Sequence, residues 1–421
     1  METASRNIVV GVAGGIAAYK ACHVIRAFKE MGDEVRVVPT QAALEFVGKT
    51  TFEALSGNPV STTVNDAVDQ VQHVRIGKEA DLIVIAPATA DLLARMVQGR
   101  ADDLLTATLL VATCPVVVAP AMHTEMWEHP ATQANVATLR ARGIVVLQPA
   151  HGRLTGSDTG PGRLLDPEQI VDLALAAAQG SSFDTSLAGT KVLISAGGTQ
   201  EHIDPVRYIG NHSSGRQGFA LAEMAAQRGA EVTMVVANSD ALPTPAGATV
   251  HKVTSAREMQ AAIMEHAPGH DAVIMVAAVA DVRPAHPADA KLKKGRDEAA
   301  LESLALEENP DILRGLVQAR ERGELDPDLV IAGFAAETGD AEHTALELAK
   351  AKLERKGCDL LMLNEVSGNQ VFGQQRNRGV LLARDGQQRE VPDGSKLEVA
   401  GVILEELLRC LERRRTSSQD K

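Results

Sequence analysis

The sequence predicts an α/β protein with two doubly wound, three-layer domains in tandem, and three observations support this. The chain has 421 residues, which is too long for one ordinary hydrophobic core. Only 2% of the residues are aromatic although 45% are hydrophobic, so aliphatic side chains must build a core suited to parallel strands between helices. Short apolar runs alternate along the chain with segments of helical periodicity, which is the order expected of parallel sheets.

The first half contains five short apolar runs that predict strands. They cover residues 7–12, 34–39, 81–85, 115–119 and 143–147. Helical periodicity extends over residues 16–31, up to Gly32, and again over residues 166–179. Several strands end at a proline, and loops at the carboxyl ends of parallel strands gather around the ligand crevice of such a sheet.

A polar, aperiodic stretch at residues 181–190 is the best candidate for a linker between a domain at 1–180 and a domain at 191–421. The pattern then restarts with predicted strands at 191–195, 231–237, 272–277, 329–334, 360–363 and 380–383. Helices are predicted at 219–228 and 399–415, and the basic run 413–415 is interpreted as surface. No motif recurs at a fixed period, so the halves share an architecture rather than a sequence repeat.

Composition excludes several classes of function. The net charge of −13 argues against a nucleic-acid partner. Four scattered cysteines without CxxC spacing suggest neither a zinc site nor a disulfide framework. No apolar run reaches membrane-spanning length and no secretory signal pattern opens the chain, so we expect a cytoplasmic protein without a membrane partner.

Two segments rich in small residues predict anion sites. Residues 11–20 follow the first strand and open a helix, and their glycines permit close approach of a phosphate to the backbone. The segment lacks the GxGxxG fingerprint, so a nicotinamide dinucleotide is not indicated. Residues 196–215 occupy the same position in the second half, where small and hydroxyl residues leave backbone N–H groups free to face an anion.

Further motifs of the first half give these segments a context. They are His73–Asp81, Ala86–Asp91, Gly99–Leu105 and Pro120–Trp127. Together with the glycine loop they resemble the flavoprotein family of cysteine decarboxylases. The resemblance implies a flavodoxin-like domain in which His73 is catalytic and FMN binds at Gly14, Gly15, Ile16, Thr40, Ala86, Pro87, Ala88 and Thr89. In the implied chemistry, oxidation of the substrate thiol to a thioaldehyde creates the electron sink that decarboxylation needs, and the flavin then returns the hydride.

The first half departs from this family at three positions. His123 and Asp91 stand where the family commonly has Asn. The loop 151–163 resembles the family's substrate flap, but Gly156 occupies the place of the flap cysteine that protonates the enethiolate. Either another group, such as His123 or Asp158, donates this proton, or the final reduction works differently.

Motifs of the second half, in family order, resemble phosphopantothenate–cysteine ligase. They are Ala196–Gly215, Ala277–Pro284, Lys291–Lys294, Asn309–Ile312, Gly333–Thr338 and Lys352–Asp359. The resemblance implies a Rossmann-like domain that uses CTP and Mg²⁺, with Asn211 at the acyl-cytidylate, Arg207 in the same step and Lys291 on the triphosphate. Implied CTP-binding residues are Met275, Val276, Ala277, Asp281, Lys291, Pro310, Asp311, Ile312, Leu313, Phe334, Lys352 and Lys356.

The two families in this order resemble the fused bifunctional enzymes of bacterial coenzyme A biosynthesis. The implied substrates are 4′-phosphopantothenate, cysteine and CTP, and the implied assembly is a homo-oligomer in which ligase dimers join decarboxylase trimers into a dodecamer. A nicotinamide-dependent oxidoreductase is the alternative enzyme, and it lacks its fingerprint. A flavin-binding regulatory protein is the third interpretation, against which His73, Asn211 and Lys291 argue.

Overall fold

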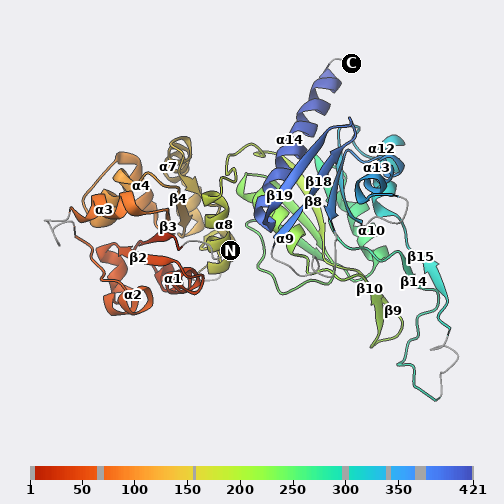
Figure 1. The fold of residues 1–421 in the computed structure, drawn as a ribbon, viewed down its shortest axis with the longest axis horizontal. Helices are drawn as coiled ribbons and strands as arrows, with labels where there is room; N and C mark the ends of the chain where they lie inside the picture. The colour runs from red at the N-terminus through yellow and green to blue at the C-terminus, as the bar shows by residue number, and fades with distance from the viewer. Residues whose placement is uncertain are drawn as a thin grey trace. The chain divides into compact units, whose positions relative to one another are not determined.

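The computed structural model describes residues 5–63, 71–154, 158–295, 303–337, 343–365 and 376–419. The chain divides into two compact units, Met1–Asp184 and Thr185–Lys421, each an α/β fold (Figure 1). The predicted fold class is confirmed. Among the described helices, none combines the length and apolarity needed to cross a bilayer.

The first unit is built on a parallel sheet in the order β2-β1-β3-β4-β5. Its strands are β1 (Asn7–Val12), β2 (Glu34–Pro39), β3 (Leu82–Ala88), β4 (Val116–Pro120) and β5 (Val145–Val146). The order reverses at β1, so the crevice of this sheet is expected outside the carboxyl ends of β1 and β3. All seven residues of β3 are buried, which explains its unbroken apolar sequence.

Helices cover both faces of this sheet. Helices α1 (Ala21–Glu30), α2 (Lys49–Ser56) and α8 (Pro167–Ala178) pack together on one face. Helices α3 (Gln72–Glu79), α4 (Ala90–Gln98), α5 (Leu104–Val111) and α7 (Pro130–Ala141) share an apolar core on the other. Short helices η1 (Ile16–Lys20), η2 (Gln41–Glu45) and α6 (Thr124–Glu128), and a hairpin of β6 (Ala150–Arg153) and β7 (Thr159–Arg163), complete the unit.

The second unit has an eight-stranded sheet in the order β12-β11-β8-β13-β16-β17-β18-β19. The strands are β8 (Lys191–Ala196), β11 (Glu231–Val236), β12 (Thr249–Lys252), β13 (Ala272–Met275), β16 (Val330–Glu337), β17 (Leu360–Glu365), β18 (Arg376–Ala383) and β19 (Gln388–Ser395). The pairings from β12 to β17 are parallel, while β18 pairs antiparallel with both neighbours. The order reverses at β8, which places the crevice beside the ends of β8 and β13.

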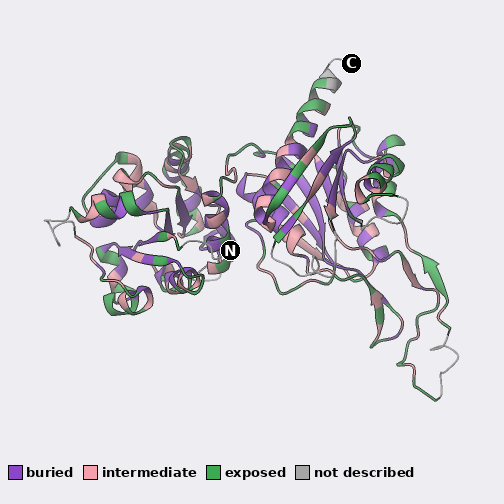
Figure 2. Ribbon diagram, in the orientation of Figure 1, coloured by how far each residue is buried: buried purple, intermediate pink, exposed green. Residues whose placement is uncertain are grey.

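Five helices within the described residues flank this sheet, and Figure 2 shows the buried residues concentrated between them and the strands. Helix α9 (Arg216–Gln227) packs against α14 (Lys396–Gln419). Helices α10 (Ala256–His266), α12 (Ile312–Glu321) and α13 (Ala345–Lys356) share one core cluster with the sheet. Two small hairpins project from the unit: β9 (Gln200–His202) with β10 (Tyr208–Gly210), and β14 (Val282–Pro284) with β15 (Leu306–Glu308).

The structure differs from the prediction in several details. The sheet of the second unit is mixed, because β18 and β19 add an antiparallel hairpin to its edge. The last helix is longer than predicted. The basic run near its end is not all surface, because Arg414 pairs with the buried carboxylate of Asp359, which also receives Arg320 at 2.6 Å.

Candidate active sites

The loops after β1, β2 and β3 converge at the reversal point of the first sheet, and we call this group the front cradle. The N–H of Ala13 donates to the carbonyl of Pro87 over 3.1 Å. The N–H of Thr40 donates to the carbonyl of Val12 over 2.9 Å. All residues predicted to bind FMN therefore lie at one edge of one sheet: Gly14, Gly15, Ile16, Thr40, Ala86, Pro87, Ala88 and Thr89.

The two central glycines of the front cradle serve different purposes. A Cβ at Gly14 would lie 2.5 Å from the Cβ of Ala42, so glycine is needed for the first two loops to pack together. A Cβ at Gly15 would meet only Thr89 Cγ2, at 3.8 Å. The space in front of Gly15 is therefore open, as the approach of a phosphate requires.

Threonines convert two strand ends of the front cradle into helix starts. Thr40 Oγ1 accepts the N–H of Ala43, and Thr89 Oγ1 accepts the N–H of Leu92, each over 3.3 Å. These are N-cap hydrogen bonds, and the capped end of α4 carries the partial positive charge of a helix N-terminus. The front cradle thus offers a phosphate group both open space and a helix N-terminus.

His73 lies in the first turn of α3 and is half-buried. Its Nδ1 is buried and has no hydrogen-bond partner within the described residues, and the same is true of Gln72 Oε1. Buried polar atoms normally have partners, so this pair is suited to a ligand that supplies them. Within the described residues, no hydrogen bond joins the side chain of His73 to the front cradle.

The β6–β7 hairpin lies against the start of α6 and brings His123 and Asp158 together. The N–H of Met122 donates to the carbonyl of Gly162 over 3.0 Å, and Thr124 Oγ1 donates to the carbonyl of Pro161 over 2.8 Å. His123 Nδ1 lies 3.3 Å from Asp158 Oδ2, with about half of each side chain exposed. Gly156, which was predicted to occupy the position of the flap cysteine, lies outside the described residues.

Asp91 is the other departure from the family pattern, and it belongs to an ion-pair network in α4. Its carboxylate lies 3.0 Å from Arg95, which also pairs with Asp102 and, at 2.8 Å, with Asp103. Asp103 also caps the start of α5. These contacts give Asp91 a structural role at the helix surface.

In the second unit, the loops after β8 and β13 form what we call the back cradle. Ser195 Oγ accepts the N–H groups of Val276 and Ala277 over 3.0 and 3.1 Å. Thr199 Oγ1 accepts the N–H of Ala280 over 3.0 Å. The sequence did not indicate Ser195 or Thr199 individually, although each is a buried hydroxyl at the end of a strand that reads as apolar.

Asn211 and two glycines close the back cradle. The amide of Asn211 donates to the carbonyl of Val279 over 3.1 Å. A Cβ at Gly198 would lie 2.7 Å from the carbonyl oxygen of Asn211. Gly197 has φ of +83°, and a Cβ there would lie 2.5 Å from the carbonyl oxygen of Asn238. The predicted Asn211 is thus bonded to the loop that follows the predicted Met275, Val276 and Ala277.

The start of α12 joins the same region through Asn309. Its side-chain amide donates to the carbonyl of Ala280 over 2.9 Å, and its N–H donates to the carbonyl of Asp281 over 2.8 Å. Pro310, Asp311, Ile312 and Leu313 follow directly. A Cβ at Gly333 would lie 2.6 Å from Leu313 Cδ2, so β16 packs against the start of α12 here, whereas Phe334, the next residue of the strand, belongs to the opposite face of the sheet.

The predicted lysines lie in different settings. Lys356 forms an ion pair with Asp311, the N-cap residue of α12, so both side chains already have a partner. Lys352 lies one turn earlier on α13. Lys291 is exposed and lies in a segment attached to the turn between β9 and β10, where Arg207 binds Asp204 and the carbonyl of Leu292.

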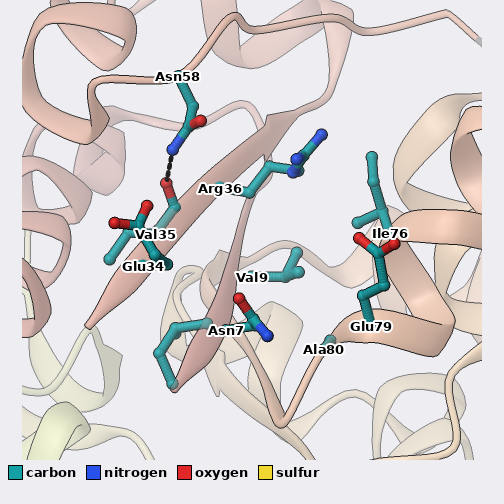
Figure 3. A pocket seen from close by; sticks show the side chains of 10 residues that line it. Asn7, Val9, Glu34, Val35, Arg36, Asn58, Ile76, Glu79 and Ala80 are labelled. Atoms are coloured by element: carbon teal, nitrogen blue, oxygen red, sulfur yellow. Dashed lines mark hydrogen bonds between the residues drawn. The ribbon is translucent and has the colours of Figure 1, made fainter. Parts of the chain in front are cut away.

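A separate pocket of about 240 Å³ opens at the amino ends of β1 and β2, the opposite ends of these strands from the front cradle (Figure 3). Arg36 and Glu79 line it with apolar groups of Val9, Ile76 and Ala80. Burial, and then the charge of Arg75, lower the pKa of Arg36, which Glu79 opposes. Arg36 forms no hydrogen bond or ion pair with any other residue that the structure describes.

No group of three or more histidine, cysteine or acidic residues within the described ranges could hold a metal ion. A metal that accompanies the nucleotide would therefore depend on phosphate and water oxygens for most of its ligands.

The folds and the two cradles define a protein with two nucleotide-type binding units, the first of flavodoxin topology and the second of Rossmann topology. The family described as Flavoprotein matches residues 1–179, and the family described as DNA/pantothenate metabolism flavoprotein C-terminal domain matches residues 187–411.

Full-length relatives agree with these two matches. Coenzyme A biosynthesis bifunctional protein CoaBC of Mycolicibacterium smegmatis is 57% identical over 406 residues, covering 96% of this chain and 98% of the relative. The protein of that name from Mycobacterium tuberculosis is 54% identical, covering 96% and 97%. The one from Vibrio vulnificus is 43% identical, covering 97% and 98%. The chain belongs to the CoaBC family of coenzyme A biosynthesis bifunctional proteins.

Proposed function

We propose that the chain catalyses two successive reactions of coenzyme A biosynthesis. The second unit ligates cysteine to 4′-phosphopantothenate and converts CTP to CMP and pyrophosphate. The first unit then decarboxylates 4′-phosphopantothenoylcysteine to 4′-phosphopantetheine. The observation that carries this proposal is the presence of two separate cradles at the reversal points of two sheets, in a chain that matches bifunctional relatives over nearly its whole length.

For the decarboxylase, the front cradle binds the FMN phosphate at Gly15 and the start of α4. When held there, FMN would supply the reversible two-electron redox chemistry that the decarboxylation needs. His73, with its buried and unpartnered Nδ1, holds or moves a proton at the reacting substrate. The hairpin of β6 and β7 excludes water from this chemistry.

His123 donates the last proton in place of the missing flap cysteine. Asp158 lies 3.3 Å from its Nδ1, so the carboxylate orients the imidazole. The His123→Ala variant should therefore accumulate the decarboxylated but unreduced product, and Asp158→Asn should do so to a smaller extent. A His123→Ala variant that forms 4′-phosphopantetheine at the normal rate would exclude this role.

For the ligase, CTP converts a poor acyl donor into an acyl-cytidylate that the cysteine amine attacks. Backbone N–H groups and the Asn211 amide at the back cradle bind the developing negative charge, and Lys291 binds the triphosphate. Ser195 and Thr199 hold the loop 276–280 in the shape that this requires. Mg²⁺ accompanies CTP, and removal of divalent ions should abolish pyrophosphate release while sparing decarboxylation.

The decisive experiment follows carbon dioxide and pyrophosphate separately in one reaction. The His73→Asn variant should lose carbon dioxide release by about 10²- to 10⁴-fold, the range of general acid–base catalysis, and keep pyrophosphate release. Lys291→Gln should release pyrophosphate more slowly, with a raised KM for CTP, and keep decarboxylation of supplied 4′-phosphopantothenoylcysteine. Loss of both activities in either variant would contradict the assignment of one reaction to each unit.

We also infer that the enzyme is a cytoplasmic homo-oligomer. Large apolar side chains are exposed around the front cradle, with Ile16 at 72%, Tyr19 at 56% and Phe46 at 50%. Such a patch favours self-association. Decarboxylase trimers joined by ligase dimers would form a dodecamer, and the mass of the particle in solution tests this. The cytoplasm is where nucleoside triphosphates such as CTP are available.

A further inference from the structure

The buried carboxylate of Asp204 organises the turn between β9 and β10, where only 1% of this residue is exposed. Its Oδ1 accepts the N–H groups of Val206 and Arg207 over 2.8 and 2.9 Å. These two bonds close the turn, as an aspartate side chain commonly does. Both bonds use Oδ1, so Oδ2 can accept hydrogen bonds from another part of the chain.

The second oxygen of Asp204 holds a distant part of the chain. The N–H of Leu292 donates to Asp204 Oδ2 over 3.1 Å, and Arg207 Nη2 lies 2.8 Å from the same oxygen. Arg207 Nη2 also donates to the carbonyl of Leu292 over 2.5 Å. Asp204 and Arg207 therefore bind both the N–H and the carbonyl of Leu292, which lies 88 positions after Asp204 in the chain.

A third contact extends this attachment. The N–H of Ala288 donates to the carbonyl of Ile203 over 2.9 Å. Residues 288–292 form no helix or strand, and these hydrogen bonds attach them to the β9–β10 turn. Lys291 and Lys293 lie on either side of Leu292 and are exposed, so their positions depend on the grip on Leu292.

The charge of Asp204 is secured by the same contacts. Burial alone would raise the pKa of this carboxyl, but the N–H groups of Val206, Leu292 and Arg207, together with the Arg207 charge, lower it below its usual value. The carboxylate is therefore ionised throughout the neutral range, and its hydrogen bonds are of the stronger, charge-assisted kind.

We propose that Asp204 is a positioning residue for the ligase reaction, which holds Leu292 so that Lys291 is presented to the triphosphate of CTP. This proposal rests on the function proposed for Lys291. It also assigns to Arg207 a role in holding the same segment, in addition to any contact with the acyl-cytidylate.

The Asp204→Asn variant tests the attachment of Leu292 without opening the β9–β10 turn. The Asn Oδ1 still accepts the N–H groups that close the turn, whereas its amide nitrogen would face two donors, the N–H of Leu292 and Arg207 Nη2. The attachment of Leu292 should therefore be lost, while the β9–β10 turn and the fold are kept. A hydrogen bond to a charged group corresponds to a factor of about ten to one hundred in an equilibrium.

Two measurements test the consequence in the full-length enzyme. Trypsin cleavage after Lys291 and Lys293, identified by mass, should become about tenfold faster in Asp204→Asn. The KM for CTP should rise by about tenfold, with a smaller change in kcat and unchanged decarboxylation of supplied 4′-phosphopantothenoylcysteine. Asp393→Asn is the matched control, because this exposed carboxylate pairs with Arg376, and it should change neither measurement.

Lys291→Gln distinguishes failure of this inference from failure of the proposed function. If Lys291→Gln raises the KM for CTP and Asp204→Asn does not, the positioning role is wrong while the function of Lys291 stands. If Lys291→Gln leaves the KM unchanged, the assigned contact with CTP is wrong and the positioning role is excluded with it. Unaltered tryptic cleavage in Asp204→Asn would equally overturn the proposed attachment.

Discussion

The two glycines of the front cradle allow a quantitative test of how the flavin site is built. In Gly14→Ala, the new Cβ would lie 2.5 Å from the Cβ, 2.7 Å from the carbonyl carbon and 2.9 Å from the carbonyl oxygen of Ala42. None of these atoms can rotate away, and carbon atoms in contact prefer about 3.5–4.0 Å. The two loops must therefore separate by about 1 Å.

The expected cost follows from overpacking in a closely packed region, which is about 1–3 kcal/mol. Replacing glycine by alanine recovers about 0.4–1 kcal/mol by restricting the unfolded chain. From the middle of each range, the net loss of stability is about 1.3 kcal/mol. For a unit of this size, that lowers the melting temperature by about 3–5 °C.

The matched control is Gly15→Ala, whose new Cβ would meet only Thr89 Cγ2 at 3.8 Å. Gly15 has φ of −177°, an extended conformation that any residue adopts. This variant should keep the stability of the apoprotein but retain less flavin, because its methyl group occupies the space open to the phosphate.

Fluorescence of the single tryptophan is a suitable assay, because Trp127 is buried in the first unit and therefore reports the unfolding of that unit. Urea unfolding of the apoproteins gives the stabilities, and flavin absorbance after gel filtration gives the retention. An apoprotein of Gly14→Ala as stable as the wild type would refute the packing argument. So would an equal destabilisation in Gly15→Ala.

Three further predictions concern groups outside the two cradles. Burial, with the charges of His266 and Lys191, lowers the pKa of His270 below its ordinary value of about 6.5. As the pH drops below about 6.5, the unfolded chain binds a proton at His270 before the folded protein does, so the free energy of unfolding should fall. Urea unfolding at pH 7.5 and 5.5 should show a smaller fall in His270→Gln than in the wild type. Burial raises the pKa of the Cys358 thiol to about 12, so this cysteine should resist a thiol reagent at pH 8 until urea unfolds the second unit, and fast labelling would contradict its burial. Arg36→Met should leave the melting temperature unchanged or raise it, because the guanidinium is partly desolvated without a partner, and a clear fall would reveal an interaction that the structure lacks.

The sequence predicted the central strands well because burial on both faces leaves an unmistakable apolar run, as in β3 and β8. It missed β12, whose residues are exposed or half-buried, and the two small hairpins, whose strands have only three residues each. A short strand at an edge is determined by the partner that it pairs with, and a local pattern does not contain that partner.

The candidate sites divide in the same way. Glycine loops directly after a strand are visible in the sequence, because the need for space at Gly14 and Gly198 is met by one residue type. The roles of Ser195 and Asp204 were not visible, since Ser195 binds N–H groups 81 and 82 positions later and Asp204 one 88 positions later. A hydroxyl or carboxylate in a sequence indicates a need for partners, but only the fold determines which partners they are.

The arrangement of contacts also bears on why two reactions are joined in one chain. The hydrogen bonds that shape the front cradle join residues between Val12 and Leu92, and those that shape the back cradle join residues between Ser195 and Asn309. The described hydrogen bonds of each cradle therefore lie within one unit, which has its own core and its own reversal of strand order. From this we infer that the fusion of the units is not what builds either site. We infer instead that its benefit lies in keeping the two sites at a fixed stoichiometry and a high effective concentration for the shared intermediate.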